Sequence, residues 1–118
     1  MSQAPAADEE LRCAARLVAA MCDLAPEDFT GPKKGAPPLV HARQVLCYLL
    51  HTEGGLDQVV ISTLLNRHRS TVGHAIQVVA ELRDNADVDR AVTRLGEMYR
   101  DLRDARAKIP ALLEEIAP

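Results

Sequence analysis

Apolar residues recur every three or four positions along most of the chain, which is the spacing of one face of an α-helix. The pattern predicts helices at residues 8–24, 39–53, 56–65, 69–83 and 88–108, with a short turn at 26–29 and a last helical piece at 109–116. No segment shows the period of two that marks a half-buried strand. The predicted fold class is therefore all-α, a small helical bundle. The expected core positions lie on these stripes and include Leu11, Ala14, Val18, Met21, Phe29, Leu46, Val72, Ile76, Val79, Leu82, Leu95 and Leu102.

Proline and glycine divide the chain. Residues 30–38 are too rich in both to form a helix or a strand, so they predict one real loop, which carries Lys33 and Lys34. Pro110 is predicted to break the last long helix, so that the residues after it turn. We expect three parts: a flexible N-terminal segment at 1–8, a helical domain at 9–106 and a C-terminal helical tail at 107–118.

Composition narrows the classes of function. Aromatic residues make up only 3% of the chain, which argues against a base-stacking platform. No apolar run approaches the ~20 residues of a membrane span, and the acidic N-terminus lacks the features of a secretory signal. The three cysteines have no CxxC spacing and lie in apolar settings, which suits reduced, buried thiols rather than zinc ligands. We expect a cytoplasmic, nucleoid-associated protein with no membrane partner and no metal.

Charge is distributed unevenly. The formal net charge is −3, but residues 31–74 hold five bases against two acids. All four histidines also fall in this block. A local basic face can bind phosphate groups even when the whole protein is mildly acidic. The middle block is therefore the candidate nucleic-acid-binding segment.

The predicted helices at 56–65 and 69–83 are joined by a short polar turn and read as a helix-turn-helix. In that motif the N-terminal end of the second helix enters the major groove of duplex DNA. Here that end carries hydrogen-bonding side chains, and Arg69 has the fork that bonds a guanine at two points. A helical bundle with a polar corner has the same pattern, so the pattern alone leaves both readings open.

Two blocks of residues carry a resemblance. Arg43 and Gln44 open an apolar helix, and about twenty residues later Arg67, Thr71, Val72, His74 and Ala75 fall on the pattern Arg-Asp-His-Thr-Thr-Val-x-His-Ala, with Ser70 replacing a threonine. This arrangement resembles the C-terminal DNA-binding domain of the bacterial replication initiator DnaA, over about residues 9–103. The chain departs from the family at His68-Arg69, which replace Asp-His, and at Ser62, which replaces a glycine. His41 stands where the family often has an arginine that probes the minor groove.

The resemblance implies sequence-specific duplex DNA binding, in replication initiation, its regulation or transcription control. Together with the charge pattern it predicts the DNA-contacting residues Lys33, Lys34, His41, Arg43, Gln44, Arg67, His68, Arg69, Ser70, Thr71 and His74. The phosphate-binding motif GxxxxGK[ST] is missing, so we expect a free-standing domain that binds no nucleotide or other cofactor. No nucleophile or acid–base pair indicates an enzyme.

The rival hypothesis is a protein-interaction module that retains the fold but not specific DNA binding, which the acidic termini favour. The tail is part of this question, because Leu112, Leu113 and Ile116 extend an apolar stripe beyond the family resemblance. We expect the tail either to fold back on the bundle or to pair two copies of the chain as a homodimer.

Three other groupings have simpler explanations. His51, Glu53 and Asp57 straddle a Gly-Gly pair and lack metal-site spacing. Cys47 and His51, four residues apart, are expected to be a core cysteine beside a surface histidine rather than an activated thiol. The alternating charges at 94–104 are expected to form a solvated helix face.

Overall fold

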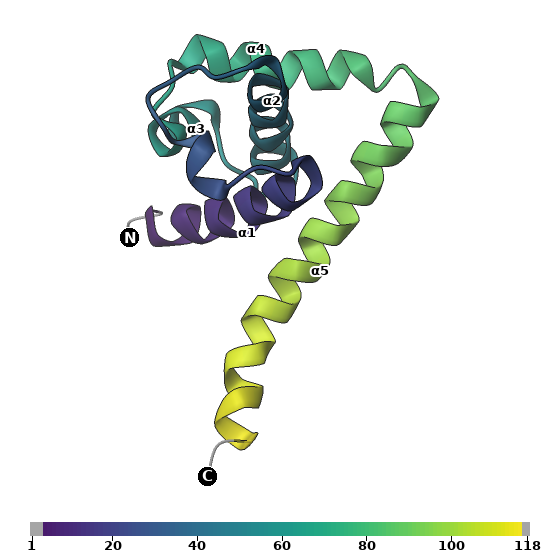
Figure 1. Ribbon diagram of the computed structural model, residues 1–118. Helices are drawn as coiled ribbons and strands as arrows, with labels where there is room; N and C mark the ends of the chain where they lie inside the picture. The colour runs from purple at the N-terminus through teal and green to yellow at the C-terminus, as the bar shows by residue number, and fades with distance from the viewer. Residues whose placement is uncertain (1–3, 117–118) are drawn as a thin grey trace.

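Six helical elements follow one another in the computed structural model, which describes residues 4–116 (Figure 1). They are α1 (Ala4–Cys22), the short 3-10 helix η1 (Pro26–Phe29), α2 (Pro37–Thr52), α3 (Gln58–Leu65), α4 (Arg69–Leu82) and α5 (Ala86–Ile116). Within residues 4–116 there is no strand, which confirms the predicted all-α class. None of the helices in this part of the chain has both the length and the apolar character that a membrane crossing requires.

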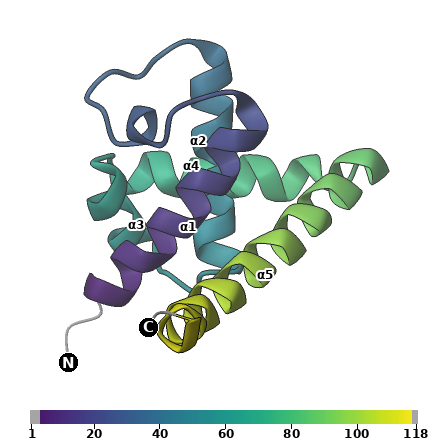
Figure 2. The same ribbon diagram turned by 60° about the horizontal axis from the view of Figure 1, so that its bottom comes forward.

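The core lies where α1, α2, α3 and α4 meet. Figure 2 shows α1 and α4 crossing α2, whose buried side chains therefore contact helices on more than one side. Alanines on the inner face of α1 allow its backbone to approach α2 closely, because a small side chain shortens the distance between packed helices. The largest fully buried side chains are Val18, Phe29, Leu46, Leu49, Leu50, Ile61, Leu65, Val72 and Tyr99. Phe29 packs inward as the sequence predicts.

The first helix begins earlier than the apolar stripe indicates. Because α1 starts at Ala4 and Ala7 is buried, the predicted flexible segment at 1–8 is wrong from residue 4 onward, and residues 1–3 lie outside the described residues. Met21 was an expected core position but is 59% exposed. The inner face of α1 is formed by short residues such as Ala14 and Ala19, which a hydrophobicity pattern weights weakly beside methionine.

Capping residues account for most of the other helix boundaries. The second helix begins at Pro37 rather than at residue 39, because a proline at the first helical positions lacks only an N–H that would have no partner there. The third helix begins at Gln58 because the Asp57 side chain accepts a hydrogen bond of 3.0 Å from the backbone N–H of Val60.

Pro110 does not break the last helix, contrary to the sequence prediction. The fifth helix runs unbroken from Ala86 to Ile116 with Pro110 inside it. The side chains around Pro110 are exposed, so water can replace the hydrogen bond that the missing N–H cannot make. Leu112 and Leu113 stay exposed, and the prediction that the tail folds back on the bundle is therefore wrong. Leu82 on α4 and Leu102 on α5 are exposed for a related reason, because both α4 and α5 extend past the edge of the core.

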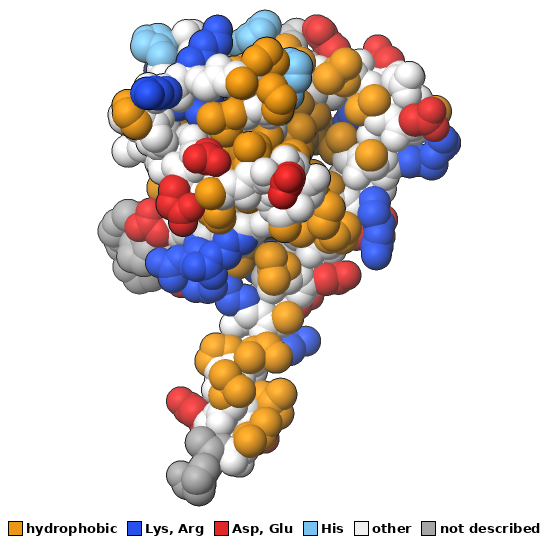
Figure 3. Space-filling model, in the orientation of Figure 1, with side chains coloured by type: hydrophobic (Ala, Val, Ile, Leu, Met, Phe, Trp, Pro, Cys, Tyr) orange, Lys and Arg blue, Asp and Glu red, His pale blue; other side chains and the backbone are white. Residues whose placement is uncertain are grey.

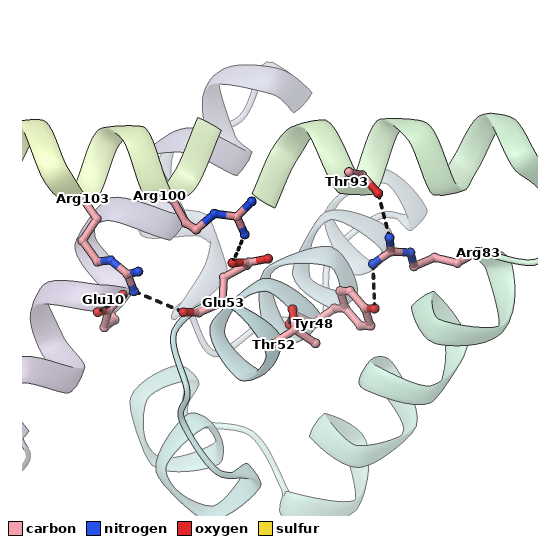
Figure 4. Close-up of polar contacts among 8 residues, drawn as sticks. All are labelled: Glu10, Tyr48, Thr52, Glu53, Arg83, Thr93, Arg100 and Arg103. Atoms are coloured by element: carbon pink, nitrogen blue, oxygen red, sulfur yellow. Dashed lines mark hydrogen bonds and ion pairs between the residues drawn. The ribbon is translucent and has the colours of Figure 1, made fainter. Parts of the chain in front are cut away.

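Arginines attach the first half of α5 to the bundle (Figure 4). Arg83 donates to the Tyr48 hydroxyl at 3.0 Å and to the Thr93 hydroxyl at 2.8 Å, which fixes the corner between α4 and α5. Arg100 pairs with the Glu53 carboxylate at 2.5 Å, and Arg103 donates to the Glu53 carbonyl at 3.1 Å. The expectation of a purely solvated face is wrong for these two arginines, because both cross to the end of α2.

Candidate nucleic-acid interface

A groove of about 580 Å³ lies between the loop before α2, the first turns of α2 and the start of α4. Seven of the residues predicted to contact DNA line it: Lys34, Arg43, Gln44, Arg67, His68, Thr71 and His74. The remaining four, Lys33, His41, Arg69 and Ser70, are exposed and adjoin lining residues in the sequence. The fold therefore brings three separate sequence segments to one side of the molecule.

This side carries no negative side chain in its own segments. Residues 29–52 and 58–80 contain neither aspartate nor glutamate. Figure 3 shows histidine, lysine and arginine side chains gathered along its upper edge, over the region of the loop and α4. The acidic residues of the chain lie elsewhere: in α1 and just after it, in the 3-10 helix, in the α2–α3 connection, at the last turn of α4 and just after it, and in α5. The potential at the groove is set by cations and by dipoles.

Arg43 is buried and does not face solvent. It is only 6% exposed, and its guanidinium donates to the carbonyls of Phe29 and Lys34, each at 3.1 Å, and of Asp28 at 3.3 Å. The predicted phosphate contact is therefore wrong for this residue, because its donors already bond the backbone around the loop. Burial, together with the neighbouring positive charge of Arg67, lowers the pKa of Arg43.

Arg67 has a related structural role. It is half-buried, and it donates to the carbonyls of Gly31 at 2.7 Å and Lys33 at 3.1 Å on the loop. It also donates to the carbonyls of Leu65 and Asn66 at the turn before α4. Arg67 therefore ties the loop to that turn rather than extending toward a phosphate. The guanidinium groups of Arg43 and Arg67 thus place positive charge beneath the loop, whose own Lys33 and Lys34 are exposed to solvent.

The start of α4 is built by its capping residue. The Nδ1 atom of His68 accepts the backbone N–H of Ser70 at 3.1 Å and lies 2.7 Å from the Ser70 hydroxyl oxygen. A neutral ring that accepts at Nδ1 carries its proton on Nε2, so His68 keeps one donor for a ligand. Arg69, Thr71 and His74 are exposed, and the helix N-terminus adds a favourable dipole for anions.

Two further residues belong to the site, although the sequence pattern does not single them out. Asn66 ends α3 in the left-handed conformation, with φ of 53°, which lets the chain turn within three residues. An asparagine directly after an apolar run is a usable signal for such an end. Val40 lines the groove one residue before His41, and nothing in the pattern distinguishes it from a core valine.

The cysteines differ in their surroundings, and this gives a testable prediction. Burial raises the pKa of the Cys47 thiol to about 12 and also raises the pKa of Cys13, whereas Cys22 is exposed. The expectation of three buried thiols is thus wrong for Cys22. Iodoacetamide at about pH 8 should label the folded protein once, at Cys22, because Cys47 then stays a thiol beneath the groove. Peptide mass spectrometry measures the site, and rapid labelling of Cys47 would contradict the burial described.

The other polar groupings are occupied by internal contacts. The Nδ1–H of His51 donates to the Leu56 carbonyl at 2.8 Å, and Glu53 pairs with Arg100. Among the side chains of the described residues, no group of three or more histidine, cysteine or acidic residues is arranged to hold a metal ion. His51 and Glu53 therefore have structural roles within the fold.

Neither a model of a known protein family nor a curated protein matches the sequence. The resemblance to the DnaA C-terminal domain therefore stays a prediction from Arg43, Gln44 and the residues at 67–75.

Proposed function

We propose that this protein binds duplex DNA through its basic face. The basic face comprises Lys33, Lys34, His41, Gln44, His68, Arg69, Ser70, Thr71 and His74. The observation that carries the proposal is the convergence of these side chains, from a loop and two helix starts, around a groove without a carboxylate. Phosphate contacts from such a face supply affinity and register on the duplex, whereas base contacts supply sequence preference.

The start of α4 is the element that enters the major groove. It follows α3 after a three-residue turn, and this succession of two helices supports a helix-turn-helix reading. Arg69 donates to guanine O6 and N7, and the Thr71 methyl packs on a thymine methyl. The Ser70 hydroxyl gives its hydrogen to His68 Nδ1, so its oxygen accepts from an amino group on a base edge. His68 caps this end by accepting the backbone N–H of Ser70, which stabilises the start of α4 before DNA binds.

The loop before α2 binds the backbone. Lys33 and Lys34 are exposed, while the carbonyls beside them are held from below by Arg43 and Arg67. A loop fixed in advance loses little conformational entropy when it binds, so its lysines contribute more of their Coulombic attraction to affinity. His41 and Gln44, on the first turns of α2, lie between this loop and the start of α4.

The biological setting follows from the resemblance to the DnaA domain. The proposed roles are control of replication initiation, by occupying sites related to the initiator's boxes, or transcription control at such sites. The replacement of Asp-His by His68-Arg69 changes two side chains at the base-reading end of α4. We therefore propose a preferred sequence different from the family's own box.

One observation favours a second role in protein interaction. The last part of α5 carries exposed apolar residues far from the basic face in the sequence, and Figure 1 shows that this part projects away from the bundle. An interaction there is compatible with DNA binding, because the two surfaces share no residue.

Selection of preferred sites from a random duplex library, followed by anisotropy titration, tests the proposed function. Arg69→Ala should cost about 1–3 kcal/mol on the selected site and relax the preference at one base position. Arg90→Ala is the matched control, because Arg90 is exposed on α5 and pairs only with Asp87 among the described residues. No enriched sequence would contradict specific recognition, and an equal loss for Arg69→Ala on every duplex would make Arg69 a phosphate contact.

A further inference from the structure

The last part of α5 carries a continuous apolar stripe that the bundle does not cover. Figure 3 shows it as apolar side chains on the projecting end of the molecule. Its large members are between 38% and 69% exposed: Leu102, Ile109, Leu112, Leu113 and Ile116. Exposed apolar residues scattered singly need no explanation, but a contiguous stripe on a projecting helix marks an interaction surface.

The spacing of the stripe specifies another helix as its partner. Leu102, Ala105, Ile109, Leu112 and Ile116 are separated alternately by three and four residues. This is the heptad repeat of a coiled coil, in which the apolar seam of one helix packs into the same kind of seam on another. Pro110 lies off the seam, so its ring does not interfere with such packing.

The charges beside the seam favour one orientation of the partner. Lys108 and Glu115 occupy equivalent flanking positions one heptad apart. In an antiparallel pair with Ile109 opposite Leu112 of a second copy, Lys108 lies beside Glu115 of that copy, and the twofold symmetry repeats this ion pair. A parallel pair in register instead places Lys108 beside Leu113 and leaves this complementarity unused.

The position of the bundle favours the same orientation. Leu95 and Met98 continue the seam toward the N-terminus, but both are half-buried, and Leu95 packs against the protein's own core. A parallel partner would run alongside this covered part, whereas an antiparallel partner places Ile116, the last described residue of its α5, level with Ala105.

We propose that residues 105–116 pair with the same residues of a second copy as a short antiparallel coiled coil. The pairing covers the exposed stripe from Ala105 to Ile116 and sets the two bundles at opposite ends of the joined helices. It goes beyond the proposed DNA binding, because it makes the protein bivalent, with two basic faces carried by one particle. Once one basic face has bound a DNA molecule, the second face is held close to the same molecule, which raises the effective concentration for its binding.

Sedimentation equilibrium of the full chain tests the pairing. The interface is short, so we expect a reversible dimer with a Kd on the order of tens of micromolar. Ile109→Glu should make the chain monomeric without unfolding it, because Ile109 is already exposed in the monomer. Val59→Glu, which introduces the same charge at an exposed apolar position on α3, should leave the dimer intact. A native chain that stays monomeric at about ten times the expected Kd would overturn the proposal.

A charge exchange tests the orientation. Lys108→Glu and Glu115→Lys should each weaken self-association about 5- to 30-fold, because each replaces two attractive pairs with two repulsive ones. A mixture of the two variants should form heterodimers of about native strength, since both pairs are then attractive again, one in the native polarity and one reversed. Failure of the mixture to associate, with a dimeric native chain, would overturn the antiparallel arrangement.

Discussion

Replacing Arg43 with alanine is expected to lower the free energy of unfolding by about 3 kcal/mol. The guanidinium donates to carbonyls on both sides of the loop, including a buried bond to Phe29, and alanine leaves these acceptors without their donor. Chemical denaturation followed by circular dichroism measures the change. Arg43→Lys should recover only part of the loss, because an ammonium group cannot bond three divergent carbonyls at once.

The same variant separates the two roles considered for Arg43. A phosphate contact would lose DNA affinity at unchanged stability, whereas a residue that supports the loop loses stability first. The matched control is Arg90→Ala, whose exposed ion pair should be worth less than about 1 kcal/mol. An Arg43→Ala protein as stable as the control would contradict the role assigned to this side chain.

Replacing Lys33 and Lys34 together by alanine should have the largest effect on DNA affinity. Removing two phosphate contacts should flatten the slope of log affinity against log salt by about 2 and weaken binding to all sequences alike. Stability should not change, because Arg43 and Arg67 bond backbone carbonyls of this loop rather than the lysine side chains. Anisotropy titrations at several salt concentrations measure both quantities.

A control with the same change in net charge makes this test specific. Arg90 and Arg94 are exposed on α5, and their joint replacement by alanine also removes two positive charges. We expect this variant to bind DNA nearly as the native chain does. If both double variants lose affinity equally, the loop has no special place in the interface.

Much of the fold could be predicted from the sequence because its helices are amphipathic and separated by strong breakers. The loop, which occupies residues 30–36 of the predicted 30–38, and the start of α4 at Arg69 are marked by residues with fixed local preferences. Pro110 shows the limit of such local rules. The break it predicts depends on whether the lost hydrogen bond can be replaced, and that depends on solvent exposure, which a local pattern does not show.

The candidate site was predictable in outline, but individual roles were not. Charge alone makes Arg43 and Arg69 look equivalent. Their positions on the helices differ, because Arg43 precedes the buried Leu46 and Cys47 by three and four residues and therefore lies on the inward face of α2. That signal was present in the sequence. The bond from Arg67 to Gly31 joins residues 36 positions apart, and only the tertiary fold brings them together.

The most direct test of the central claim is the salt dependence of binding between the full native chain and a labelled duplex. Lys33 and Lys34 together predict that log affinity falls with log salt at a slope of about −2, at about 0.9 for each phosphate contact. Binding of this kind should be measurable by anisotropy at low salt and should weaken steadily as salt is added. No measurable binding at low salt, or an affinity that does not change with salt, would contradict the account.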